Sequence, residues 1–185
     1  MKTIIILIAI VTLLSAETKH GFQILAGGRY DNVRMCVASD AGVEGGMMLD
    51  IAYMFEKKRE GKNSIGAKIP IMRPILFGAS FGMVQFEPEF FIKNYSSKKE
   101  SLYWMPGFGL SVHYGPDYKT DKEAIDPEKF WALGPIFSSA FGVVIGDNSK
   151  REKSIAVRPF ITPLFAKDGK SGVVAGGSLE FLMLF

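Results

Sequence analysis

Histidine and serine are the residue types with which this chain could do covalent chemistry, and they lie close together at one place. His113 follows Ser111 by two residues, so both side chains point to the same side of an extended strand, with Tyr103 further along that side. An acyl-transfer site also needs an acid that orients the histidine and donors for an oxyanion, and no spacing in the sequence supplies them. We therefore expect no catalytic residue, and we interpret His113 as a histidine near an interface or a lumen mouth.

Two other patterns that could bind a ligand lack residues that their chemistry needs. Residues 169–171 have the end of a phosphate-binding loop, but Leu164 stands where the first glycine must be and no helical pattern follows. Two histidines and the single cysteine, Cys36, do not make a zinc site, and the acids of residues 115–129 lack the spacing of a calcium loop. The sequence predicts no metal and no cofactor, and a net charge of +3 without a basic stripe predicts no nucleic-acid partner.

Extended strands are the elements that must position the remaining polar side chains. From Gly21 onward, apolar residues recur at every second position, whereas a helix would repeat them every three to four residues. Eight such segments can be delimited, and the phase is lost between Arg73 and Gly82, where turn, bulge and strand all stay open. The segments are Phe22–Asp31, Val43–Glu56, Ile65–Met72, Val84–Lys93, Leu102–Tyr114, Trp131–Ile145, Ile155–Ala166 and Gly172–Phe185.

The two sides of these segments differ in a way that separates two kinds of barrel. The majority side is bulky and apolar, while the minority side collects glycine, small residues and charges of both signs. A soluble sandwich or lipocalin-like barrel places its charges outside, in water. In a membrane barrel they must pair inside, because a lysine or arginine on the lipid side costs about 2–4 kcal/mol at mid-bilayer. We expect a lumen charge network with the members Arg29, Glu44, Asp50, Lys68, Glu87, Glu89, Arg158 and Glu180.

Proline is the feature that fits a closed barrel least well. Seven of the nine prolines fall in or beside the predicted strands, and a proline removes a hydrogen bond from the strand ladder. Because a closed barrel has no edge strands, we expect these prolines near strand ends or at bulges. They are Pro70, Pro74, Pro88, Pro106, Pro135, Pro159 and Pro163.

The first sixteen residues have the organisation of a cleaved secretory signal. Lys2 precedes an apolar run of about half the ~20 residues that a helix needs to cross a bilayer, and Ser15 and Ala16 offer a small-residue cleavage site. We expect residues 1–16 to be removed and residues 17–185 to form one barrel domain. No cysteine follows the run that could carry a lipid there, and one cysteine forms no intrachain disulfide.

The carboxy-terminal segment has the pattern of a strand whose outer side lies in lipid. Its last five residues are apolar, which termini exposed to water rarely are. Outer-membrane barrels have an even number of strands, short periplasmic turns and longer outside loops. The second, fourth and sixth predicted connections are short and the fifth, Gly115–Lys129, is long, although the seventh is short too. We therefore place both termini in the periplasm and expect any extracellular ligand at the loop of residues 115–129.

These features together resemble a known group of proteins. A terminal phenylalanine preceded by apolar residues at alternate positions is similar to the assembly signal of bacterial outer-membrane β-barrels, and here the matching residues are Leu179, Phe181, Met183 and Phe185. With the leader and eight segments, the mature chain resembles the small OmpA/OmpX/OmpW-like barrels. The resemblance implies an all-β, antiparallel up-and-down transmembrane barrel in the outer membrane of a Gram-negative cell envelope. Its partners would be outer-membrane lipid and, through the last strand, the barrel-assembly machinery.

Three hypotheses for function follow. The leading one is a non-enzymatic, porin-like outer-membrane barrel with a packed, charge-lined lumen, serving envelope structure, surface binding or the passage of small hydrophobic molecules. The second is a soluble periplasmic carrier barrel of the lipocalin type. The third is an outer-membrane enzyme that modifies lipid A, for which His113 would be needed.

Overall fold

The computed structural model describes residues 18–31, 45–58, 63–82, 84–96, 101–116, 129–148, 151–166 and 171–185. The predicted signal peptide, Glu44 and most of the loop 115–129 lie outside these residues. In the part that is described, the one helix is far too short to cross a membrane.

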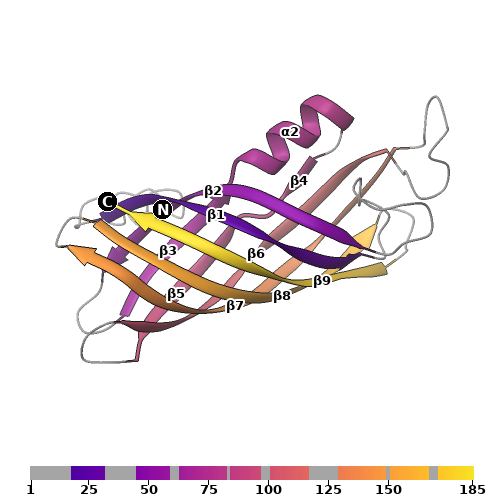
Figure 1. Cartoon of the computed structure of the whole chain (residues 1–185). Coiled ribbons are helices and arrows are strands. Elements are labelled where there is room, and N and C mark those ends of the chain that lie inside the picture. Colours follow the sequence, from indigo (N-terminus) through magenta and orange to yellow (C-terminus); the bar gives the residue numbers. More distant parts are fainter. Residues whose placement is uncertain are drawn as a thin grey trace, which may run out of the picture.

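Antiparallel strands that follow one another around a ring make up the fold (Figure 1). Each wall strand pairs with the next in the chain, and the last pairs with the first, so eight strands close into a barrel. The predicted all-β up-and-down barrel is therefore confirmed. The strands are β1 Thr18–Asp31, β2 Gly46–Lys58, β3 Asn63–Pro70, β4 Val84–Phe86, β5 Glu89–Tyr95, β6 Leu102–Pro116, β7 Lys129–Asn148, β8 Arg151–Ala166 and β9 Ser171–Leu184.

The short strand β4 and the strand β5 are two parts of one predicted segment. Both pair with β6 in a single register, with Gln85 opposite His113 and Phe90 opposite Phe108. Between them the Leu110 amide donates to the Pro88 carbonyl at 3.2 Å, but Pro88 has no N–H to donate in return. The proline therefore interrupts one wall strand without shifting it, and β4 is a short ninth strand that continues β5 along β6.

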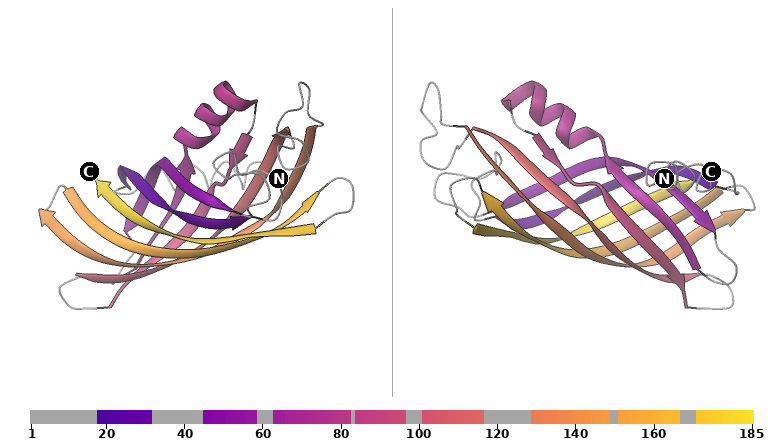
Figure 2. Two further views of the ribbon diagram at one scale, coloured as in Figure 1. Left: turned by 45° about the vertical axis from the view of Figure 1, so that its right-hand side comes forward. Right: turned by 180° about the vertical axis from the view of Figure 1, so that it is seen from behind.

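Residues 73–82, for which turn, bulge and strand were open, form a helix instead. Helix α2 spans Met72–Phe81 and stands out from the wall beside β4 (Figure 2). Pro74 lies in its first turn, where no intrahelical bond needs its N–H. The Arg73 amide, also in that turn, donates to Asp50 Oδ1 at 2.8 Å. The helix is thus capped by a side chain of β2, which no local pattern reveals.

The expectation for prolines is wrong for four of the seven. Pro106, Pro135, Pro159 and Pro163 lie inside strands, and the ladder of β7 with β8 skips the last three of them. The register places Pro135 opposite Pro163, so neither can donate to the other. The wall tolerates these prolines because each strand loses hydrogen bonds on one side only. On their other sides, the β6–β7 and β8–β9 ladders continue past the prolines without a gap.

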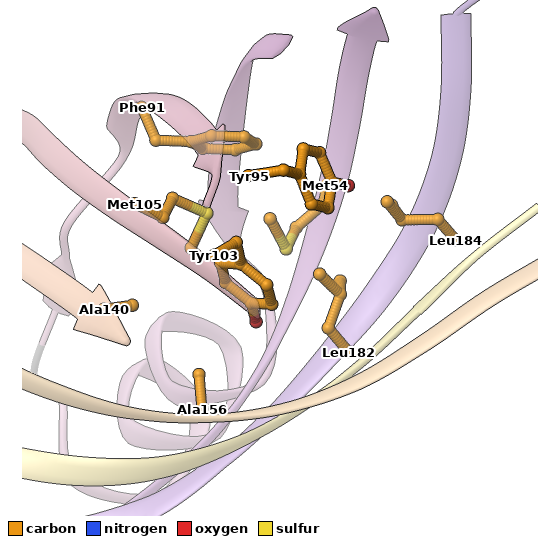
Figure 3. Close-up of a cluster of buried hydrophobic side chains, with 9 residues drawn as sticks. All are labelled: Met54, Phe91, Tyr95, Tyr103, Met105, Ala140, Ala156, Leu182 and Leu184. Atoms are coloured by element: carbon orange, nitrogen blue, oxygen red, sulfur yellow. The ribbon is translucent and has the colours of Figure 1, made fainter. Parts of the chain in front are cut away.

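Apolar side chains fill both ends of the interior. The cluster nearer the termini (Figure 3) places Tyr95 and Tyr103 edge to face, with ring centroids 6.1 Å apart, and it also contains Met54, Phe91, Met105, Ala140, Ala156, Leu182 and Leu184. The cluster at the far end, called here the distal apolar cluster, consists of Leu25, Met48, Ala132, Ile136, Phe160, Leu164 and Val174. Buried polar side chains lie alongside these two clusters as well as between them, and they form the candidate site.

Two adjacent glycines test how tightly the first and last strands approach. A Cβ on the inward Gly27 would lie 2.1 Å from the Gly177 carbonyl oxygen, a backbone atom, whereas a Cβ on the outward Gly28 would meet nothing closer than the Gly46 oxygen at 3.9 Å. We expect Gly27→Ala to lower the free energy of unfolding by about 1–3 kcal/mol and Gly28→Ala to leave it unchanged. Urea unfolding of the folded barrel, followed by tryptophan fluorescence, measures both. Equal losses in the two variants would contradict the close approach.

Candidate functional site

The barrel is polar inside and apolar outside. Its buried side chains include five lysines and arginines and seven carboxylates, while each of the eight wall strands exposes large hydrophobic residues. Met47, Phe90 and Val157, for example, are 84, 71 and 58% exposed. The outward side chains are those of the predicted majority faces, and the inward ones those of the minority faces. The ion pairs fall into three clusters along the barrel.

The cluster farthest from the termini, the distal cluster, is organised around two arginines. Arg29 lies 2.9 Å from Asp31 and also donates to Gln85. Arg73, from the first turn of α2, bridges Asp50 at 3.4 Å and Glu87, with which it is in close contact. The helix therefore contributes a cation to the interior, and this cation joins β2 to the β4–β5 junction. Arg29 joins β1 to β4 through Gln85.

The central cluster is a four-membered network of two cations and two carboxylates. Glu89 contacts both Lys68, at 2.8 Å, and Arg158. Glu180 lies 3.7 Å from Arg158 Nε and accepts a hydrogen bond from Gln23 at 2.7 Å. Because the charges balance and the groups come from β1, β3, β5, β8 and β9, this cluster joins opposite walls of the barrel.

The cluster nearest the termini, the proximal cluster, surrounds one fully buried lysine. Lys93 contacts Glu152 closely and Glu56 at 3.4 Å, and its ammonium lies 4.5 Å from the centroid of the Tyr103 ring. Tyr95 donates to Glu152 at 2.9 Å. The carboxylates and the aromatic ring together replace the water that Lys93 loses on burial.

The structure places seven of the eight residues of the predicted network inside the barrel. Lys68, Glu89, Arg158 and Glu180 meet in the central cluster. Asp50 and Glu87 meet only through Arg73, and Arg29 lies with Asp31 in the same distal cluster. The eighth residue, Glu44, lies outside the described residues.

Five charged members were missed. Arg73 could not be found, because its segment shows no phase and its position depends on α2. Glu152 was assigned to a turn, and extending the period of two backwards from Ile155 would have placed it inside. Asp31, Glu56 and Lys93 were on the predicted inner faces, and only their ion pairs were not apparent from the sequence.

His113 points into the barrel near the end farther from the termini, three residues before β6 ends at Pro116. Its side chain is wholly buried, and its Nε2 lies 3.3 Å from Glu87 Oε1. Ser111 Oγ donates to the same oxygen at 3.0 Å. In a catalytic triad the histidine stands between serine and acid, whereas here the carboxylate stands between the other two. Among the described residues, no group of three or more histidine, cysteine and acidic side chains is placed to hold a metal ion.

Fold and site together define a class: an eight-stranded antiparallel barrel with an ion-paired interior and an apolar exterior. Comparisons with known proteins name no particular member of it. No family model matches the chain, and no curated protein and no solved structure matches it either. What the protein does must therefore be argued from its own residues.

Breaking the central cluster should lower the free energy of unfolding more than removing an exposed surface charge does. We expect Arg158→Met to lower the free energy of unfolding by about 3–5 kcal/mol, because Glu89 and Glu180 would keep only Lys68 as a cation. Adding Glu89→Gln restores neutrality and should recover part of that loss. The exposed Lys153 of the same strand is the control, and its change to methionine should stay within about 0.5 kcal/mol in the same urea titration. No recovery in the double variant would refute the pairing.

Proposed function

We propose that this protein is an integral β-barrel of the bacterial outer membrane, with a filled lumen and a non-enzymatic role. The observation that carries the proposal is the inverted polarity of the barrel. Contiguous apolar surface around a whole barrel is not found on soluble proteins, and a soluble carrier would reverse the two faces. Around this barrel the outward positions are apolar and the buried ones hold the charges. Lipid is the surroundings in which both faces are satisfied.

The height of the apolar surface supports the proposal. Trp104 and Tyr114 are outward aromatic residues near opposite ends of β6, ten residues apart. At a rise of ~3.4 Å per residue and a tilt of ~40°, they are separated by roughly 26 Å along the barrel axis. The apolar band of outer-membrane barrels is ~25 Å tall and is bounded by such aromatic residues. Tyr114 also pairs with Trp131 of β7, which continues the aromatic boundary at the end of the barrel farther from the termini.

The lengths of the connections between strands indicate how the barrel is oriented in the membrane. His20 and Phe185 exchange backbone hydrogen bonds, so both ends of the described barrel lie on one side. On that side the wall strands are joined by residues 59–62, 96–101 and 149–150. On the other side residues 32–45, 71–83 and 117–128 form three connections of 12 or more residues, and residues 167–170 form a fourth, short one. Short turns on the periplasmic side and long outside loops are the arrangement of outer-membrane barrels. We infer that the termini face the periplasm.

The filled lumen limits the functions that the barrel can have. The ion-paired side chains of all three clusters are nearly inaccessible to solvent, so they close the interior at three levels. We infer that the barrel conducts no ions and acts in the envelope as a stable scaffold that displays its outer loops, including residues 115–129. Lipid A modification is a weaker candidate, because Ser111 and His113 lie buried around one carboxylate.

Fractionation tests the proposal. We expect the mature protein in the outer-membrane fraction, extractable only with detergent, and we expect its gel mobility to change on heating because the closed barrel resists the detergent until boiled. A protein found wholly in the soluble periplasm would overturn the proposal and favour the carrier. Unaltered lipid A mass on overexpression would dismiss the enzyme.

Removing the last residue tests the assembly signal. Phe185 both exposes its ring and closes the β1–β9 seam, with its amide donating to the His20 carbonyl at 2.7 Å. We expect deletion of Phe185 to impair membrane insertion strongly while secretion continues. Phe185→Ala keeps the backbone pair, so it separates loss of the ring from loss of the seam. Normal insertion of both variants would show that the terminal residue is not an assembly signal.

A further inference from the structure

A group of aromatic side chains lies on the outer face of the wall at the end where β1 begins and β9 ends (Figure 1). The ring centroid of Phe22 is 5.9 Å from that of Tyr53 and 6.3 Å from that of Phe185. His20 stacks on Tyr53, and its Nδ1 lies 2.5 Å from the Tyr53 hydroxyl oxygen. Three adjacent strands thus present rings that contact one another, and such rings are typical of the boundary between hydrocarbon and lipid head groups.

Two cations of β8 lie beside this aromatic group. The register places Lys153 opposite Met183 of β9 and Met183 opposite Phe22 of β1, so these three outward side chains form one row across the wall. Arg151 lies one outward position nearer the beginning of β8. Both cations are exposed, and the next outward residue of the strand is the apolar Ile155. The cations therefore stand where the apolar surface of β8 ends.

The charges at this end of the strand are sorted between the two faces of the wall. Glu152 lies between Arg151 and Lys153 in the chain, so it points the other way and contacts Lys93 inside the barrel. The carboxyl group of Phe185 accepts a backbone N–H of β1 across the seam. Even with that group counted as a carboxylate, the two cations leave the outer face positive here.

The connections between the strands have the same asymmetry of charge. By sequence, the three connections on this side contain five basic and two acidic residues, whereas the four on the other side contain six basic and eight acidic ones. The end that faces the periplasm in the proposed orientation is therefore the more basic one. Lysine and arginine near a membrane surface attract anionic lipid, by about fivefold in affinity for each residue.

We propose that the outer face of β8, β9 and β1 at this end binds the head group of an anionic phospholipid in the periplasmic leaflet. Lys153 and Arg151 contact the phosphate, while Met183 and the Phe22 ring lie against the glycerol and the upper part of an acyl chain. A zwitterionic lipid brings its own cation to the phosphate and is bound less well. The inference rests on the proposed membrane location, and it assigns to the barrel a selectivity among lipids that an apolar wall alone does not have.

The site is tested by nuclear magnetic resonance of the full mature barrel in phosphatidylcholine nanodiscs to which phosphatidylglycerol is added. The amide signals of Lys153, Met183 and Phe22 should shift and saturate as the phosphatidylglycerol fraction rises. Raised salt should weaken this binding, because exposed charges are screened. Signals that do not respond to the phosphatidylglycerol fraction would show an aromatic boundary without head-group selectivity, and would overturn the site.

Charge variants separate a site from general attraction to the membrane. Lys153→Gln should weaken phosphatidylglycerol binding at these signals about fivefold, and adding Arg151→Gln should weaken it about twentyfold. Lys129→Gln, the control, removes one exposed cation at the other end of the wall and should leave the binding unchanged. Equal binding in Lys153→Gln and Lys129→Gln would overturn the site while leaving the membrane location intact. A chain that does not enter the nanodisc at all would instead contradict the membrane location itself.

Discussion

The charged side chains that the strands turn inward have to find their partners inside the protein, because the outward face of the wall offers only apolar surface. This constraint organises the rest of the molecule. A shift of one residue in any strand would move its charges to the outside and its large hydrophobic residues into the lumen. The pairs Glu89–Arg158 and Lys93–Glu152 join residues far apart in the chain. Pairing across the lumen therefore fixes strand register and closure together.

The same constraint explains why the interior is filled and why a helix belongs to the wall. The three clusters leave the remaining lumen to glycines, small residues and two apolar clusters, and at Gly27 a side chain would strike the backbone of β9. Helix α2 departs from the strand pattern, yet its first turn is capped by Asp50 and supplies Arg73 to the distal cluster. The irregular part of the wall is thus held by the same kind of interaction as the regular part.

The sequence was sufficient for features that depend on neighbouring residues and insufficient for those that depend on distant ones. Period-two patterning predicted which face of each segment is buried, because alternation is a local property of a strand. It could not reveal α2, whose cap comes from β2, nor the place of Arg73. It missed Glu152 because β8 begins at Arg151, four residues before the predicted segment Ile155–Ala166. Four prolines inside strands were not predicted, because a strand tolerates a proline when only one of its two neighbouring ladders loses a hydrogen bond.

The central claim is that the outward face of the wall lies in lipid. Spin labels on single cysteines in a Cys36→Ser background test it most directly, because oxygen concentrates in lipid and a nickel chelate stays in water. A label at Val157, which is outward on β8, should be accessible to oxygen and protected from the chelate, and one at Lys153 near the end of the same strand should show the reverse. Access of the chelate to Val157 equal to that at Lys153 would contradict the account.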